Sequence, residues 1–159
     1  MAVLFTTVKN TNLETIVHFD TAAAETGTLT IANLGAATQA LVSGGTPTVN
    51  IVKFISTGAD GATLRITRNG KNIIACAPEN APFLDLNSNG FADTTNNTYD
   101  IVVNNDVAKP VTGYLILRKV AGWSTTVETA YYGAYDDPTI VGAANISGSP
   151  GAPGATPIG

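Results

Sequence analysis

The stretch Leu64-Arg65-Ile66-Thr67-Arg68-Asn69-Gly70-Lys71-Asn72-Ile73-Ile74-Ala75 decides the fold class of this chain. Two runs in which apolar and polar residues alternate flank Asn69-Gly70, and a two-residue Asn-Gly loop favours a type I′ turn between antiparallel strands. Apolar side chains then meet on one face, while polar ones line the other. The stretch predicts a β-hairpin with three cross-strand pairs: Arg68 with Lys71, Ile66 with Ile73, and Leu64 with Ala75.

Alternation of period two recurs along the chain, as expected for strands with one buried face. Leu13–Asp20 places Leu13, Val17 and Phe19 on one face. Val49–Ile55 is apolar on both faces and predicts a central strand covered on each side. We expect further strands at Thr28–Ile31, Phe83–Leu86, Tyr99–Asn104 and Val111–Val120. No stretch before Trp123 has a sustained helical period, so the sequence predicts an all-β fold: an antiparallel β-sandwich or jelly roll over residues 1–123.

The composition changes after Trp123. Residues 124–159 form a Tyr-containing segment and then an extended C-terminal arm rich in Gly, Ala and Pro. Such an arm cannot bury enough apolar area to offset its own ordering entropy, so we expect it to dock on a neighbouring subunit. Tyr and Trp are enriched at the centres of protein interfaces. Packing of these aromatic residues against their own sandwich and stacking on a sugar ring are the alternatives. The predicted interface residues are Trp123, Tyr131, Tyr132, Tyr135, Pro150, Pro153 and Pro157.

Charge and rare residues limit what the protein does. Of 159 residues only 13% are charged, and the net charge is −4. A nucleic-acid-binding domain needs a basic patch, which this chain lacks. Its single cysteine excludes an internal disulfide. No run approaches the length of a membrane helix, and Met1–Thr7 lacks the basic region of a signal peptide. We therefore expect a protein without nucleic-acid or membrane partners, assembled in the host cytoplasm.

The segment from Asp85 to Asp93 resembles a calcium-binding loop. Its oxygen-bearing residues alternate as in D-x-[DN]-x-[DN]-G, with Gly90 at the sharp turn. The twelfth position, however, holds Asn96 instead of a bidentate Glu, and no helices flank the loop. The alternative is a polar loop without calcium, whose residues favour turns. The candidate ligands are Asp85, Asn87, Asn89 and Asp93.

Two residue types usual in catalysis occur once each. His18 shares a predicted strand face with Glu14 and Asp20, but no second His or Cys completes a metal set. No G-x-S-x-G motif supplies a serine nucleophile. Cys76 lies in an apolar run and is expected to be a packed thiol. We therefore predict no catalytic residue, no cofactor and no enzymatic activity.

Several segments of the N-terminal two-thirds carry a family resemblance. They are Phe5–Thr11, Leu13–His18, Ile66–Gly70, Asp85–Leu86 with Gly90, Thr98–Val103 and Leu115–Trp123. With these residues the chain resembles small virion structural proteins of tailed bacteriophages, particularly of the cyanophage type. The resemblance implies a particle component without enzymatic activity. It does not extend to the arm after Tyr135.

The sequence thus predicts a capsid decoration (cement) protein that binds the assembled shell and stabilises it. Its expected partners are the major capsid protein or other virion subunits, and its expected location is the virion. A homo-oligomer is expected, a trimer first among the symmetric forms. A neck, tail or baseplate component is the first alternative, and a carbohydrate-binding β-sandwich is the second.

Overall fold

The computed structural model describes residues 2–37, 39–42, 44–88 and 90–124. The described residues among 1–36 and 41–123 form one compact unit. This unit is built from nine antiparallel strands and two short 3-10 turns, and its described residues contain no α-helix. The strands are β1 (Leu4–Asn10), β2 (Glu14–Thr21), β3 (Thr26–Leu29), β4 (Thr48–Gly58), β5 (Leu64–Arg68), β6 (Lys71–Cys76), β7 (Phe83–Asp85), β8 (Ile101–Asn105) and β9 (Val111–Ala121).

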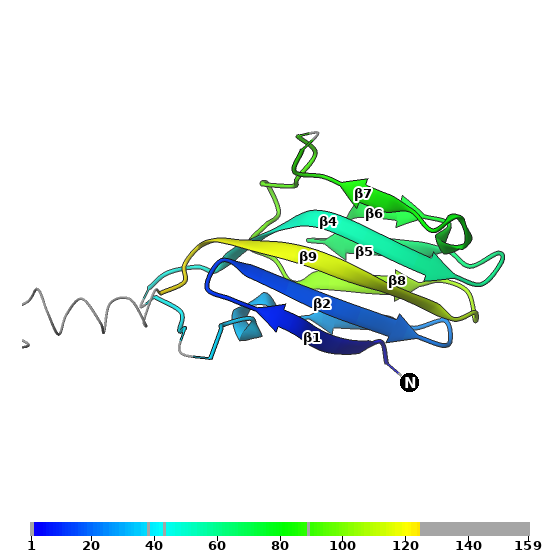
Figure 1. The fold of residues 1–159 in the computed structure, drawn as a ribbon, viewed down its shortest axis with the longest axis horizontal. Helices are drawn as coiled ribbons and strands as arrows, with labels where there is room; N and C mark the ends of the chain where they lie inside the picture. The colour runs from blue at the N-terminus through cyan, green and yellow to red at the C-terminus, as the bar shows by residue number, and fades with distance from the viewer. Residues whose placement is uncertain (1, 38, 43, 89, 125–159) are drawn as a thin grey trace, which may run out of the picture. The chain divides into compact units, whose positions relative to one another are not determined.

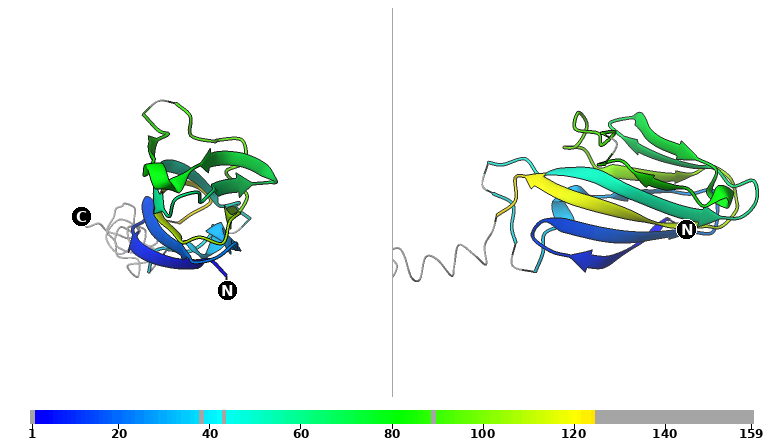
Figure 2. Two further views of the ribbon diagram at one scale, coloured as in Figure 1. Left: turned by 90° about the vertical axis from the view of Figure 1, so that its right-hand side faces the viewer. Right: turned by 45° about the horizontal axis from the view of Figure 1, so that its top comes forward.

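The strands form two sheets that face each other around a common core (Figures 1 and 2). Sheet A has the order β1-β2-β9-β4-β7, and sheet B has the order β3-β8-β5-β6. Four pairs are nested in the sequence: β2 with β9, β3 with β8, β4 with β7, and β5 with β6. A long hairpin wound into two sheets gives this nesting, which is the jelly-roll arrangement. The predicted fold class is confirmed, and β1 extends sheet A by one edge strand.

Alternating burial along each strand supplies the core. In β2 the buried residues are Thr15, Val17, Phe19 and Thr21, and the residues between them are more exposed. In β9 every second residue from Val111 to Lys119 is buried. Phe19 and Phe54 stack at the centre with a ring-centroid distance of 6.2 Å. The expectation for Leu13 was wrong, because Leu13 precedes β2 in the turn after β1 and is exposed.

The predicted hairpin is present, with a corrected register. Asn69 and Gly70 have φ angles of 50° and 70°, the left-handed pair that a type I′ turn requires. Arg68 lies opposite Lys71 as expected, but a β-bulge follows between Ile66 and Thr67. Beyond it Ile66 pairs with Ile74, and Leu64 pairs with Cys76. The extra residue of the bulge shifts both predicted apolar pairs by one position.

Strand β4 is an inner strand of sheet A, between β9 and β7, but it is not covered on each side as expected. Lys53 is exposed and Ile55 is only half-buried. The register of β4 against β9 shifts between Ile51 and Lys53, so that Ile51 and Val52 are both buried. A bulge changes which face successive residues occupy. The apolar run Val49–Ile55 is therefore explained by a bulge in a strand with one buried face, and not by burial of both faces.

The predicted division into a sandwich over 1–123 and a segment over 124–159 stays a prediction, because residues 125–159 lie outside the described residues. The predicted interface residues Tyr131, Tyr132, Tyr135, Pro150, Pro153 and Pro157 lie there too. A second unit includes Ala37, Gln39, Ala40 and Ser124 among the described residues. In it the Ser124 N–H donates to the Ala40 carbonyl at 2.9 Å, and the Ala40 N–H donates to Ser124 Oγ at 3.0 Å.

Candidate contact surface

The outer face of sheet A carries apolar and aromatic side chains across all five strands. One transverse row follows directly from the strand register: Thr6, His18, Tyr114, Ile55 and Phe83. The next row consists of Lys9, Ile16, Ile116, Lys53 and Asp85. Phe83 is 59% exposed and Tyr114 is 40% exposed. We call these two rows, with the flanking rows Leu4-Asp20-Thr112-Thr57 and Glu14-Arg118-Asn50, the contact face.

His18 is held in place at the centre of the contact face. Its Nε2 lies 2.7 Å from Thr112 Oγ1, and its ring centroid is 5.0 Å from that of Tyr114. The Thr112 hydroxyl donates its one proton to the Phe19 carbonyl at 3.1 Å, so His18 Nε2 must donate to Thr112. The two rings are therefore fixed as a platform.

A shallow, open pocket of about 310 Å³ lies at one end of the contact face. Residues at the ends of β2 and β4 and around the start of β9 line it. Asp20 is its one charged group, with the hydroxyls of Thr57 and Thr112 beside it. The remaining lining residues are Gly58, Ala59, Pro110 and Val111.

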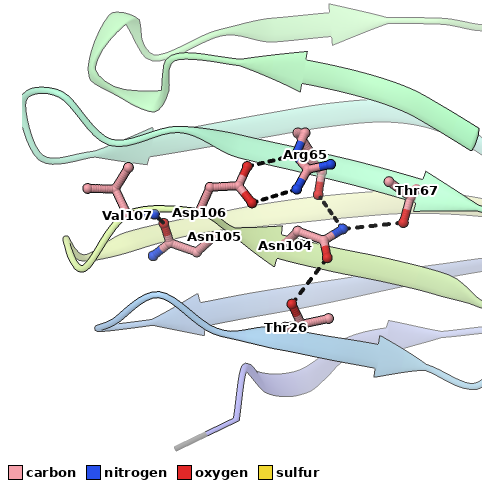
Figure 3. A network of polar contacts seen from close by, with 7 residues as sticks. All are labelled: Thr26, Arg65, Thr67, Asn104, Asn105, Asp106 and Val107. Carbon is pink, nitrogen blue, oxygen red and sulfur yellow. Dashed lines mark hydrogen bonds and ion pairs between the residues drawn. The ribbon is translucent and has the colours of Figure 1, made fainter. Parts of the chain in front are cut away.

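The outer face of sheet B differs, because its polar groups bond to one another (Figure 3). Arg65 and Asp106 form a two-pronged ion pair at 2.6 and 2.7 Å. Asn104 Nδ2 donates to the Arg65 carbonyl and to Thr67 Oγ1, and Thr26 Oγ1 donates to Asn104 Oδ1. A face whose polar groups already have partners has little to offer a second protein. Of the two outer faces, that of sheet A is the better contact surface.

Two of the four predicted calcium ligands, Asp85 and Asp93, serve as turn caps. The Ser88 hydroxyl and N–H donate to the Asp85 carboxylate at 2.5 and 3.0 Å and hold the pKa of that carboxyl below its usual value. Asp93 accepts from the N–H groups of Thr95 and Asn96. Asn87 is exposed, and Asn89 lies outside the described residues. No three His, Cys, Asp or Glu side chains of the described chain gather around one point. Calcium binding therefore stays a prediction.

Cys76 and Trp123 both pack against the core. The Cys76 sulfur lies 3.8 Å from Ser56 Oγ, and burial raises the pKa of its thiol, which disfavours the reactive thiolate. Trp123 is half-buried, and its Nε1 donates to the Thr48 carbonyl at 3.4 Å. Trp123 thus packs on its own sandwich, and its predicted interface role stays a prediction.

Sequence reasoning missed two buried cations. Arg68 is fully buried and donates to the carbonyls of Val49, Asn97 and Tyr99. Lys119 is 6% exposed, and its Nζ donates to Asn10 Oδ1 and the Thr11 carbonyl, both at 2.8 Å. The one available signal was that both residues occupy inward positions in the alternation of their strands. The side chains of Arg68 and Lys119 each hold a loop against the sandwich by these hydrogen bonds.

Lys119 gives the stability a pH dependence that can be measured. Burial lowers its pKa from 10.5 to about 8. Between these values the unfolded chain holds a proton that the folded chain lacks, so the free energy of unfolding rises with pH, by at most about 1.4 kcal/mol per pH unit. Urea unfolding of the natural chain and of Lys119→Met checks this. The difference, natural minus variant, should increase from pH 7.5 to pH 10; a constant or falling difference would contradict it.

The strand order defines this chain as a jelly-roll β-sandwich. No family model matches its sequence, and no curated protein matches it either. Among solved structures, it is similar to an uncharacterized conserved protein with a double-stranded β-helix domain from Klebsiella pneumoniae subsp. pneumoniae MGH 78578. The TM-score is 0.39 at 9% sequence identity, over 77% of this chain and 83% of that chain. Within the described residues, no helix is long and apolar enough to cross a membrane.

Proposed function

We propose that this protein is a structural component of a tailed-phage particle and acts as a decoration protein on the assembled shell. The observation that carries the proposal is the contact face, where a row with exposed Tyr114 and Phe83 crosses all five strands of sheet A. Tyr114 lies on the central strand β9, and aromatic residues near the centre of an interface are its usual anchors. The resemblance of the sequence to virion structural proteins supports a phage particle as the assembly to which the protein belongs.

The mechanism is thermodynamic linkage. A protein that binds only the assembled shell stabilises the shell by its own binding free energy, which is about 2.7 kcal/mol per site at a hundredfold excess over the dissociation constant. A rigid sandwich suits this task because little conformational entropy is lost when its sheet face binds. Neither the binding nor the resulting stabilisation of the shell needs a proton donor, a nucleophile or a metal.

Removing the central anchor tests the proposal. Tyr114→Lys places a charge in the middle of the contact face and is expected to weaken binding to purified phage heads about 30-fold or more, the loss typical of an interface hot spot of about 2 kcal/mol. Thr28→Lys is the matched control, because Thr28 is exposed on the outer side of sheet B. Co-sedimentation with heads measures both. Equal binding by the two variants would refute a role for the contact face.

A carbohydrate-binding role is the second candidate, and the pocket favours it. Asp20, Thr57 and Thr112 offer hydrogen-bonding groups to a sugar, and Tyr114 lies two residues from Thr112 on the same outer face of β9. Aromatic rings with an apolar body and a polar tip suit such mixed contacts. Glycan-array binding that is lost in Asp20→Asn would favour this role over shell binding.

A neck, tail or baseplate location is the other alternative. In that case the protein would bind purified phage tails instead of heads.

A further inference from the structure

We propose that Lys119 and Asn10 form an isopeptide bond within the folded chain, in which the lysine amine displaces the side-chain nitrogen of the asparagine as ammonia. The reaction is a self-modification and is independent of the proposed function. Asn10 ends β1 and Lys119 lies near the end of β9, so the bond ties the first strand of sheet A to the last. Three observations carry it: the closeness of the two groups, the fixed orientation of the amide and the burial of the amine.

The fold holds the amine against the amide. Lys119 Nζ donates to Asn10 Oδ1 at 2.8 Å. The amide carbon Cγ is one C=O bond of about 1.23 Å beyond this oxygen, so Nζ lies within about 4 Å of it. A near-attack geometry needs about 3–3.5 Å, which a small rotation of the lysine stem provides. Strand β2 separates β1 from β9 in the sheet, and its Thr15 lies directly opposite Asn10.

Hydrogen bonds fix the orientation of the Asn10 amide. Its Oδ1 accepts from the Thr15 hydroxyl at 2.9 Å as well as from Lys119, and its Nδ2 donates to the Gly35 carbonyl at 2.9 Å. Thr15 is fully buried. When Nζ attacks Cγ, negative charge develops on Oδ1, and a donor that is already in place there stabilises the intermediate. Nδ2, the nitrogen that leaves, is held at the other end of the amide by Gly35.

Burial activates the amine, because only the neutral form attacks a carbonyl carbon. Lys119 is 6% exposed, and burial lowers its pKa from 10.5 to about 8. About a tenth of the amine is then neutral at pH 7. Nζ keeps an acceptor in the Thr11 carbonyl at 2.8 Å, and the Trp123 ring centroid lies 5.2 Å from it. The bond therefore accumulates slowly at neutral pH, and freshly purified protein still holds the free amine whose titration is described above.

The atoms and charges of the reaction balance without a co-reactant. The lysine ammonium first loses a proton to water. Neutral Nζ then bonds to Cγ, the carbonyl electron pair moves to Oδ1, and it returns when the bond from Cγ to Nδ2 breaks. One proton passes from Nζ to Nδ2, which leaves as ammonia and takes up a proton from water. An ammonium group and a carboxamide thus become a secondary amide and an ammonium ion, and nothing is oxidised or reduced.

The bond changes stability as well as mass. It joins residues that are far apart in the sequence, so it closes a long loop and restricts the unfolded chain, as a disulfide across a long loop does. The cross-linked form should therefore unfold at a higher urea concentration than the fresh chain.

Mass spectrometry of the full chain tests the inference. Incubation at pH 9 should give a form lighter by one ammonia, and digestion should leave one branched peptide that contains both Asn10 and Lys119. The branched peptide is the deciding readout, because Asn69-Gly70 can also lose ammonia by closing a succinimide. Its rate of formation should be about tenfold higher at pH 9 than at pH 7, since it follows the neutral fraction of an amine with a pKa of about 8.

Three controls isolate the geometry. Lys119→Arg keeps a cation that stays protonated and should give no branched peptide. Thr15→Val keeps both reacting groups but removes a donor to Oδ1, and it should slow the reaction at least tenfold. The natural chain in urea keeps every residue but not their placement. It should give no branched peptide either, and this control does not depend on the folding of a variant.

Three results would overturn the inference. They are a folded natural chain without branched peptide after weeks at pH 9, an equal yield in urea, and a rate that neither Thr15→Val nor the change of pH alters. Binding to phage heads is measured separately with the fresh chain. The inference and the proposed function can therefore fail independently of each other.

Discussion

Replacing Arg68 by Met is expected to lower the free energy of unfolding by about 4 kcal/mol. Two carbonyls, one buried and one partly buried, lose their hydrogen bonds at roughly 1–3 kcal/mol each, and the local packing is disturbed. The Tyr99 carbonyl accepts hydrogen bonds from Nε and Nη2 of Arg68, at 2.9 and 2.6 Å. The Val49 carbonyl accepts one from Nη1 at 2.6 Å. The Asn97 carbonyl keeps a second donor, the Val49 N–H. Urea denaturation measures the loss.

Arg68→Lys separates geometry from charge. Burial already lowers the pKa of Arg68 to about 10, so the fold accepts a cation here at a cost. A lysine keeps the charge but has no planar fork to reach carbonyls on two sides, and we expect it to recover less than half of the loss. Arg65→Met is the matched control on the same strand. Its ion pair with Asp106 is exposed, so it should cost less than about 1 kcal/mol. Equal losses at Arg65 and Arg68 would contradict this account.

Gly113→Ala should cost about 3 kcal/mol, at the upper end of what overpacking a core usually costs. A Cβ at Gly113 would lie 2.3 Å from the Ile55 carbonyl oxygen and 2.6 Å from Cζ of Phe19. The carbonyl belongs to the neighbouring strand β4 and cannot move without opening the sheet. Thermal and urea unfolding should both show the loss.

Gly70→Ala is the control for this substitution. A Cβ at Gly70 meets nothing within 4 Å, so the variant carries only the cost of a left-handed backbone, about 1 kcal/mol. The Gly113 variant should therefore be the less stable of the two. The opposite order would show that β4 and β9 have more room than the structure gives them.

Local sequence chemistry predicted most of the fold. The Asn69-Gly70 turn and the alternation around it were enough for the hairpin, and the strands β7, β8 and β9 begin within two residues of their expected starts. Two predictions failed where a bulge intervenes: the register of the hairpin beyond Ile66, and the coverage of β4 on both faces around Val52. A bulge depends on contacts with the partner strand, which a single sequence does not show. For the same reason the burial of Arg68 was not predicted: its acceptors come from Val49 and the loop at 97–99, far away in the sequence.

The contact face was not predicted because it belongs to no segment. His18, Tyr114, Ile55 and Phe83 come from four strands, and only the register between the strands brings them into one row. Sequence reasoning instead favoured aromatic residues that are close together along the chain, namely Trp123 and three tyrosines of the following segment. The polar face of His18 was anticipated, but its tyrosine neighbour was not.

A density map of the tailed-phage particle that we propose as this protein's assembly tests the central claim most directly. The account predicts the sandwich on the outer surface of the assembled head, with the contact face around Tyr114 buried against a neighbouring subunit and the Arg65–Asp106 side toward solvent. A particle that lacks the protein, or one that carries it with the contact face open to solvent, would contradict the account.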